Sequence, residues 1–70
     1  MDGNEFIKRI ERLGRKTGTP VRFLPQHGKG SHGRLFFGTA ATTVKDRKKE
    51  ISKGLLATML KQLGLNRNDI

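Results

Sequence analysis

Apolar residues near the start of the chain recur at the spacing of one helix face. The positions i, i+1, i+4 and i+7 of this stripe are Phe6, Ile7, Ile10 and Leu13. That spacing predicts an amphipathic helix. Asn4 has the side chain of a helix N-cap, and Gly14 is typical of a C-terminal cap. We therefore expect the helix to lie between these two residues and a loop to follow over residues 15–19.

The middle of the chain predicts three short strands. The first is Val21–Leu24, between Pro20 and Pro25, and flanking prolines favour an edge position. Arg34–Phe37 is expected to form the second strand, and the small and β-branched run Thr39–Val44 the third. Successive short strands joined by short loops usually pair antiparallel.

A second apolar stripe predicts a helix near the end of the chain. Its members are Leu55, Leu56, Met59, Leu60 and Leu63. Ser52 fits the N-cap of this helix, and Gly64-Leu65 resembles a Schellman ending with its hydrophobic contact. Asn66–Ile70 is expected to be a frayed tail.

These elements predict one α+β domain over residues 1–70, with the order α-β-β-β-α and a core spanning residues 4–65. Two amphipathic helices can cover one face of a three-stranded antiparallel sheet, which gives a two-layer fold. Arg22, Arg34 and Phe36 are expected to face outward. The inward set is expected to be Val21, Phe23, Leu35, Phe37 and Val44. Double-stranded-RNA-binding-like folds share this element order, although fold similarity alone does not define function.

Composition narrows the chemistry of the chain. With 70 residues, 33% of them hydrophobic, it has room for one small core and none for an enclosed cofactor cavity. The absence of Cys excludes disulfides, thiolate zinc sites and cysteine nucleophiles, and favours a reducing, intracellular setting. No apolar run approaches the ~18 residues of a membrane span. Residues 1–5 carry acids where a signal peptide would carry basic residues, and the continuous apolar segment of a signal peptide does not follow them.

Charge points to a polyanionic partner. Fifteen Lys and Arg against six Asp and Glu leave a net charge of +9. Nucleic acid is the first candidate and an anionic membrane surface the second, although many basic proteins are simply soluble. Five basic residues fall close together, namely Lys45, Arg47, Lys48, Lys49 and Lys53. They are either a strip that tracks phosphates or a solvated connection, which is the commoner explanation of a charge run.

A glycine-rich stretch lies between the first two predicted strands. Gly28–Gly33 matches G-x-G-x-x-G, but the dinucleotide fingerprint needs a helix directly after it, and here a Phe-rich strand follows. Glycines still let backbone N–H groups approach an anion closely. Lys29 and Arg34 flank the turn, and Ser31 adds a hydroxyl. The turn is thus either a phosphodiester site or a plain hairpin loop.

His32 gives this turn a candidate catalytic group. Imidazole is the side chain whose unperturbed pKa, about 6.5, lies near neutral pH. Beside a bound phosphate, His32 can take a proton from a ribose 2′-OH or give one to the departing 5′-oxygen, and neither role needs a metal. A surface histidine without a task is an equal alternative, and His27 competes for the role. A zinc site from the two is not expected, since no acidic residue lies between them.

The sequence allows two interpretations of Phe36. It can stack on a base if it faces outward. A phenylalanine in so small a domain more often belongs to the core.

Several segments together resemble the HicA family, which comprises toxins of bacterial type II toxin–antitoxin modules. The resemblance covers roughly residues 4–65, and its most specific parts are Gly30-Ser31-His32 and Leu60–Leu65. The other matching segments are Gly28–Gly33 followed by a strand, Thr42–Asp46, Lys49–Ile51 and Lys53–Leu56.

The resemblance implies a double-stranded-RNA-binding-like fold and a translation-independent mRNA endonuclease in the bacterial cytoplasm, with no metal or cofactor. It also implies a HicB-type antitoxin that masks the active site. The catalytic histidine of the family corresponds to His32. Many members have a second His directly after it, where this chain has Gly33, and a Pro-His pair after the third strand, where this chain has Lys45-Asp46.

We therefore expect His32 to be catalytic and the surrounding polar and basic residues to bind RNA. The expected RNA-binding residues are Lys29, Gly30, Ser31, Arg34, Lys45, Arg47, Lys48 and Lys49. An antitoxin is expected to offer acidic groups to the same region. A non-catalytic RNA-binding module is the alternative. Membrane binding is disfavoured, because neither helix combines a basic face with an exposed aromatic side.

Overall fold

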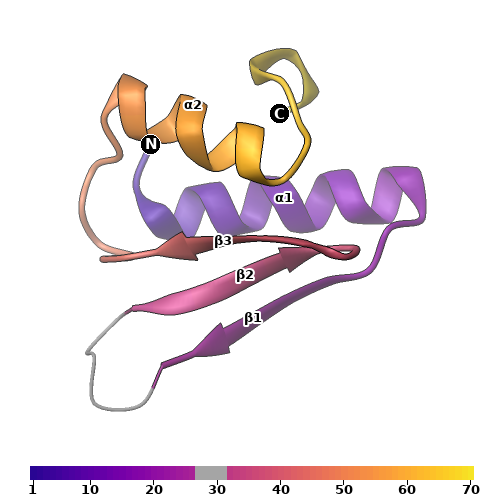
Figure 1. Ribbon diagram of the computed structural model, residues 1–70, viewed down its shortest axis with the longest axis horizontal. Helices are drawn as coiled ribbons and strands as arrows, with labels where there is room; N and C mark the ends of the chain where they lie inside the picture. Colours follow the sequence, from indigo (N-terminus) through magenta and orange to yellow (C-terminus); the bar gives the residue numbers. More distant parts are fainter. Residues whose placement is uncertain (27–31) are drawn as a thin grey trace.

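The computed structural model describes residues 1–26 and 32–70. The elements follow the order α1 (Gly3–Thr17), β1 (Val21–Pro25), β2 (Gly33–Phe37), β3 (Ala40–Val44), α2 (Lys53–Gln62) and the short 3-10 helix η1 (Arg67–Asp69). The predicted α-β-β-β-α fold is confirmed. Both long helices lie on one side of the sheet and leave its other face open (Figure 1).

The three strands form an antiparallel sheet in the order β1-β2-β3. Leu35 at the centre of β2 is fully buried and stands opposite Phe23 on one side and Thr42 on the other. Of the predicted inward set, Leu35 and Val44 are buried, whereas Val21, Phe23 and Phe37 are partly buried against the same core. The alternation of apolar and polar residues along the strands therefore predicted correctly which face of the sheet is buried.

Thr42 is an addition to the inward set that the apolar pattern did not include. Its side chain is only 1% exposed, and its Oγ1 donates a hydrogen bond to Oε1 of Gln62 on α2 at 2.6 Å. The bond satisfies a buried hydroxyl, which is costly to leave unpaired. It also ties β3 to α2.

Helix α1 begins two residues earlier than predicted. The N-cap is Asp2, whose Oδ1 accepts a hydrogen bond from the Glu5 backbone N–H at 2.8 Å. The assignment of Asn4 as the cap was wrong, because Asn4 already lies inside the helix with its side chain exposed. Its backbone N–H donates instead to the carbonyl oxygen of Arg47 at 2.9 Å.

The end of α1 was also misplaced. The helix continues through Arg15–Thr17, expected to be loop, and its C-cap is Gly18, with φ of 73° in the left-handed region. Gly14 is buried inside the helix, where a Cβ would lie 2.4 Å from Val21 Cγ2. Gly14 is therefore a point of close approach between α1 and β1, and Gly18 is the residue that ends the helix.

Both ends of α2 agree with the sequence. The Ser52 Oγ accepts from the Leu55 backbone N–H at 3.3 Å. At the other end, Leu65 N–H donates to the Leu60 carbonyl at 2.8 Å and Gly64 N–H to that of Lys61 at 3.0 Å. These two bonds define the predicted Schellman motif.

The last residues, where a frayed tail was expected, contain the short helix η1 (Arg67–Asp69). Asn66 N–H donates to Asp69 Oδ2 at 2.8 Å, and Ile70 packs against the core. Ile70 has apolar surface to bury, which the polar residues before it concealed in the sequence pattern.

The core lies between the helices and the inner face of the sheet. Its buried hydrophobic members are Phe6, Ile10, Leu35, Val44, Leu56, Met59, Leu60 and Leu63. Within the described part of the chain, neither helix combines the length and the apolar character that crossing a membrane requires.

Candidate functional site

His32 lies directly before β2, at the end of the molecule where β1 ends and β2 begins. Its carbonyl oxygen accepts a hydrogen bond from the Gln26 backbone N–H at 2.9 Å. This bond extends the β1–β2 pairing by one step beyond Pro25 and Gly33. The backbone of His32 is thereby held by the sheet, while its side chain is half-buried.

His32 lines an open hollow of about 360 Å³. Its apolar lining comes from the end of β3, the connection to α2, and α2 itself, namely Val44, Ile51, Leu55 and Met59. Its polar lining is His32 together with Lys45, Asp46, Lys49 and Glu50. An imidazole, two ammonium groups and two carboxylates therefore surround one small cavity that can admit a polar ligand.

The two carboxylates have structural partners. Glu50 pairs with the N-terminal ammonium group of Met1. Asp46 Oδ1 accepts from the Lys48 backbone N–H at 3.0 Å, and the Asp46 carbonyl accepts from Lys49 N–H at 3.2 Å. These bonds form the tight turn after β3 that brings Lys49 to the hollow.

Asp46 and Glu50 were not among the residues expected to lie beside His32. A usable signal for Asp46 existed in the predicted strands. A two-residue turn after Phe37 pairs it with Ala40, and counting back along β2 then places Val44 opposite Gly33. The residues that follow Val44 must therefore lie beside His32. For Glu50 no such local count exists, because its position depends on the contact with the N-terminus.

Gly33 explains why a second histidine has no room directly after His32. Gly33 is buried on the inner face of the sheet, and a Cβ there would lie 2.3 Å from Phe23 Cζ and 2.8 Å from the Leu24 carbonyl oxygen. The Phe23 ring occupies the space a side chain would need. Residue 33 therefore supplies close packing beside His32 and no acid–base group.

The basic residues predicted to bind RNA differ in where their side chains lie. Lys45 and Lys49 line the hollow, whereas Lys48 is exposed outside its lining. Arg47 is half-buried with its guanidinium 5.0 Å from the centre of the Phe23 ring, a cation–π contact. Arg47 thus has a packing role that the charge run did not show.

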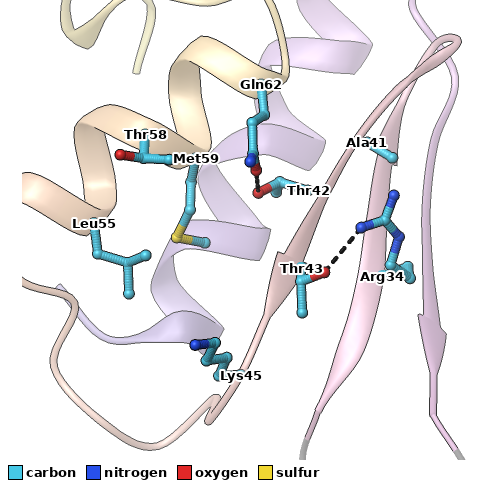
Figure 2. A pocket seen from close by; sticks show the side chains of 9 residues that line it. All are labelled: Arg34, Ala41, Thr42, Thr43, Lys45, Leu55, Thr58, Met59 and Gln62. Atoms are coloured by element: carbon cyan, nitrogen blue, oxygen red, sulfur yellow. Dashed lines mark hydrogen bonds between the residues drawn. The ribbon is translucent and has the colours of Figure 1, made fainter.

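Arg34 lies on the open face of the sheet. Its Nη1 donates to Thr43 Oγ1 at 2.8 Å, which fixes the guanidinium beside β3 (Figure 2). The remaining predicted site residues Lys29, Gly30 and Ser31, and the competing His27, lie outside the described residues.

A groove of about 370 Å³ lies between β3 and α2 and adjoins the hollow (Figure 2). The two cavities share Lys45, Leu55 and Met59. The other residues that line the groove are Arg34, Ala41, Thr42, Thr43, Thr58 and Gln62. Basic side chains therefore accompany this surface from the hollow to the open face of the sheet.

Comparison of the chain with protein-family models, with curated proteins and with solved structures gave no significant match. Over residues 1–26 and 32–70, no three His, Asp or Glu side chains gather in a group that could hold a metal ion.

Proposed function

We propose that this protein is a metal-independent endoribonuclease that cleaves mRNA, acting as a HicA-type toxin of a type II toxin–antitoxin module and so inhibiting translation and growth. The observation that carries the proposal is the half-buried His32 in a hollow with Lys45 and Lys49, on a chain of net charge +9. An imidazole beside two ammonium groups suits a phosphodiester. The resemblance to the HicA family supports the same reaction.

The reaction follows from what an imidazole can do beside a ribose–phosphate junction. The neutral ring accepts the proton of the 2′-OH while the 2′-oxygen forms a bond to phosphorus. The bond from phosphorus to the 5′-oxygen then breaks, and that oxygen takes a proton from a protonated imidazole or from water. The products are a 2′,3′-cyclic phosphate and a 5′-hydroxyl. His32 supplies either transfer, so the assignment of base or acid stays open.

The lysines have a separate role in this proposal. Negative charge builds up on the phosphoryl oxygens in the transition state, and preorganised cations stabilise it. Lys45 and Lys49 both line the hollow that His32 enters.

The test is a cleavage assay on single-stranded RNA with the purified chain in excess chelator. We expect cleavage that leaves a 5′-hydroxyl. His32→Ala should lower the rate by about 10²–10⁴-fold, the usual value of general acid–base assistance. The matched variant is His27→Ala, which removes the other imidazole of the chain. Circular dichroism of both variants verifies that the fold is retained.

Three results would remove this assignment. Undiminished cleavage by His32→Ala excludes the histidine mechanism. Cleavage of RNA with a 2′-deoxyribose at the cut site excludes attack by the 2′-oxygen. Steeply salt-dependent binding with no cleavage at all leaves a non-catalytic RNA-binding module, which needs only the charge.

We also propose a HicB-type antitoxin as the protein partner. Lys45 and Lys49 at the hollow, and Arg34 in the adjoining groove, offer three cations to acidic side chains. A partner bound there would cover His32 and exclude RNA. A structure of the complex with His32 open to solvent would contradict this masking.

A further inference from the structure

The face of the sheet that the helices leave open carries a defined set of side chains. Strand alternation places two rows of three residues on it. One row is Arg22, Phe36 and Ala41, and the next is Leu24, Arg34 and Thr43. Two arginines and two large apolar side chains thus share this face. Both long helices lie on the opposite side of the sheet (Figure 1).

Phe36 is at the centre of this face. It belongs to the middle strand, with Arg22 directly opposite on β1 and the small Ala41 opposite on β3. Its side chain is only half-buried. The outward interpretation of Phe36 is therefore correct, and the core interpretation is wrong. An aromatic ring on the central strand is in the place where a flat ligand can stack.

The arginines flank the ring and are both exposed. Arg34 is held beside β3 by its 2.8 Å bond to Thr43. Arg22 is the direct cross-strand neighbour of Phe36, so its guanidinium can reach a phosphate next to a base stacked on the ring. Both cations also disfavour a second copy of this basic chain as the occupant, because the copies would bring two charges of +9 together.

We infer that this open face is a binding platform for single-stranded RNA, with one base stacked on Phe36 and the adjacent phosphates held by Arg22 and Arg34. Exposed aromatic rings on a sheet, flanked by cations, bind unstacked bases in this way. A duplex keeps its bases stacked on each other and gains nothing from such a ring. The platform therefore selects single strands.

The platform leads to the proposed catalytic residue. Arg34 and Phe36 lie on β2, two and four positions after His32, which corresponds to roughly 7 Å and 13 Å of extended chain. One strand of RNA can therefore lie on Phe36, pass Arg34 and reach the hollow of His32. RNA as the ligand rests on the proposed function, whereas the stacking itself is measured without cleavage.

The experiment uses the full chain with His32→Ala, so that RNA stays intact, and a short fluorescently labelled oligouridylate as the probe. Phe36→Ala and Phe36→Leu should each weaken binding by about 10- to 100-fold, the value of one stacked base. Phe36→Tyr should restore it, since it restores the ring. Leu24→Ala is the matched control on the same face and should change affinity less than about threefold, because it removes apolar area but no ring.

Two further RNA probes distinguish base stacking from the attraction of charge, and a stability measurement distinguishes it from loss of the fold. An abasic oligomer of the same length should bind equally to the parent and to Phe36→Leu, and a blunt RNA duplex should also show no difference. Thermal unfolding of Phe36→Leu identifies any loss of fold.

The platform is excluded if folded Phe36→Leu binds oligouridylate as tightly as the parent, or loses duplex and abasic binding to the same degree. It is likewise excluded if sedimentation shows that Phe36→Ala changes self-association and not RNA affinity. Failure of the cleavage assay with an intact Phe36 effect would remove the nuclease and leave the platform.

Discussion

At Gly14, the need for close packing outweighs the low helix propensity of glycine. Inside a helix, glycine is about 1 kcal/mol less favourable than alanine. At Gly14, however, a Cβ would lie 2.4 Å from Val21 Cγ2 and 2.6 Å from the Thr19 carbonyl oxygen. The carbonyl belongs to the connection into β1, so it cannot move without displacing the strand.

We predict opposite signs for two Gly→Ala changes in helices. Gly14→Ala should destabilise the protein by about 1–3 kcal/mol through overpacking. Gly54→Ala should stabilise it by about 0.5–1 kcal/mol, because nothing lies within 4 Å of a Cβ at that position in α2. Urea unfolding monitored by circular dichroism measures both. Shifts of the same sign would contradict the packing argument.

At the scale of elements, the N-terminal segment and the start of α1 brace the wall of the hollow. Asn4 N–H donates to the Arg47 carbonyl at 2.9 Å, and Ile51 N–H donates to the Met1 carbonyl at 2.9 Å. The Met1 ammonium pairs with Glu50. The connection between β3 and α2, which supplies Lys45 and Lys49, is therefore positioned by residues from the other end of the chain.

The cap of α1 can be tested by comparing two nearby substitutions. Asp2→Ala should cost about 1 kcal/mol, since it removes the acceptor for Glu5 N–H and a negative charge at the positive end of the helix. Asn4→Ala should stay within about 0.5 kcal/mol, as expected for an exposed helical side chain. Chemical denaturation measures the free energy of unfolding of both variants. A larger loss for Asn4→Ala than for Asp2→Ala would mean that Asn4, and not Asp2, is the N-cap.

At the scale of the whole molecule, the net charge of +9 acts together with the location of the hollow. β2 begins, β3 ends and α2 begins at the same end of the molecule, and α1 ends at the opposite one (Figure 1). His32, Lys45 and Lys49 gather at the first of these ends. The overall charge attracts a polyanion, whereas this arrangement decides where its phosphates are held.

Salt dependence should identify the phosphate-binding lysines. We expect Lys45→Gln and Lys49→Gln each to reduce the slope of log affinity against log salt by about 0.7, the value for one contact to single-stranded nucleic acid. Lys16→Gln, near the far end of α1, should leave the slope unchanged. Titrations of oligouridylate at several salt concentrations measure it. Equal effects of all three would mean that binding is diffuse.

Features that depend on a few neighbouring residues were predictable. The Schellman ending at Gly64 and the cap at Ser52 need only local hydrogen bonds, and the stripes of both helices need only their own periodicity. The ends of α1 were not predictable in the same way. Asn4 and Gly14 have the residue types of caps, and only the contacts of Gly14 with Val21, across the turn at Gly18, show that the helix runs past it.

The sequence by itself determined the order of the elements, the two-layer arrangement, the excess of positive charge and the presence of His32 before the second strand. Tertiary structure decided which charges meet that histidine. It brought Lys45, Lys49 and two carboxylates to the hollow and engaged Arg47 with Phe23. The physical reason is range, because periodicity and caps act within a few residues, whereas strand register and contacts with the N-terminus join residues that are far apart along the chain.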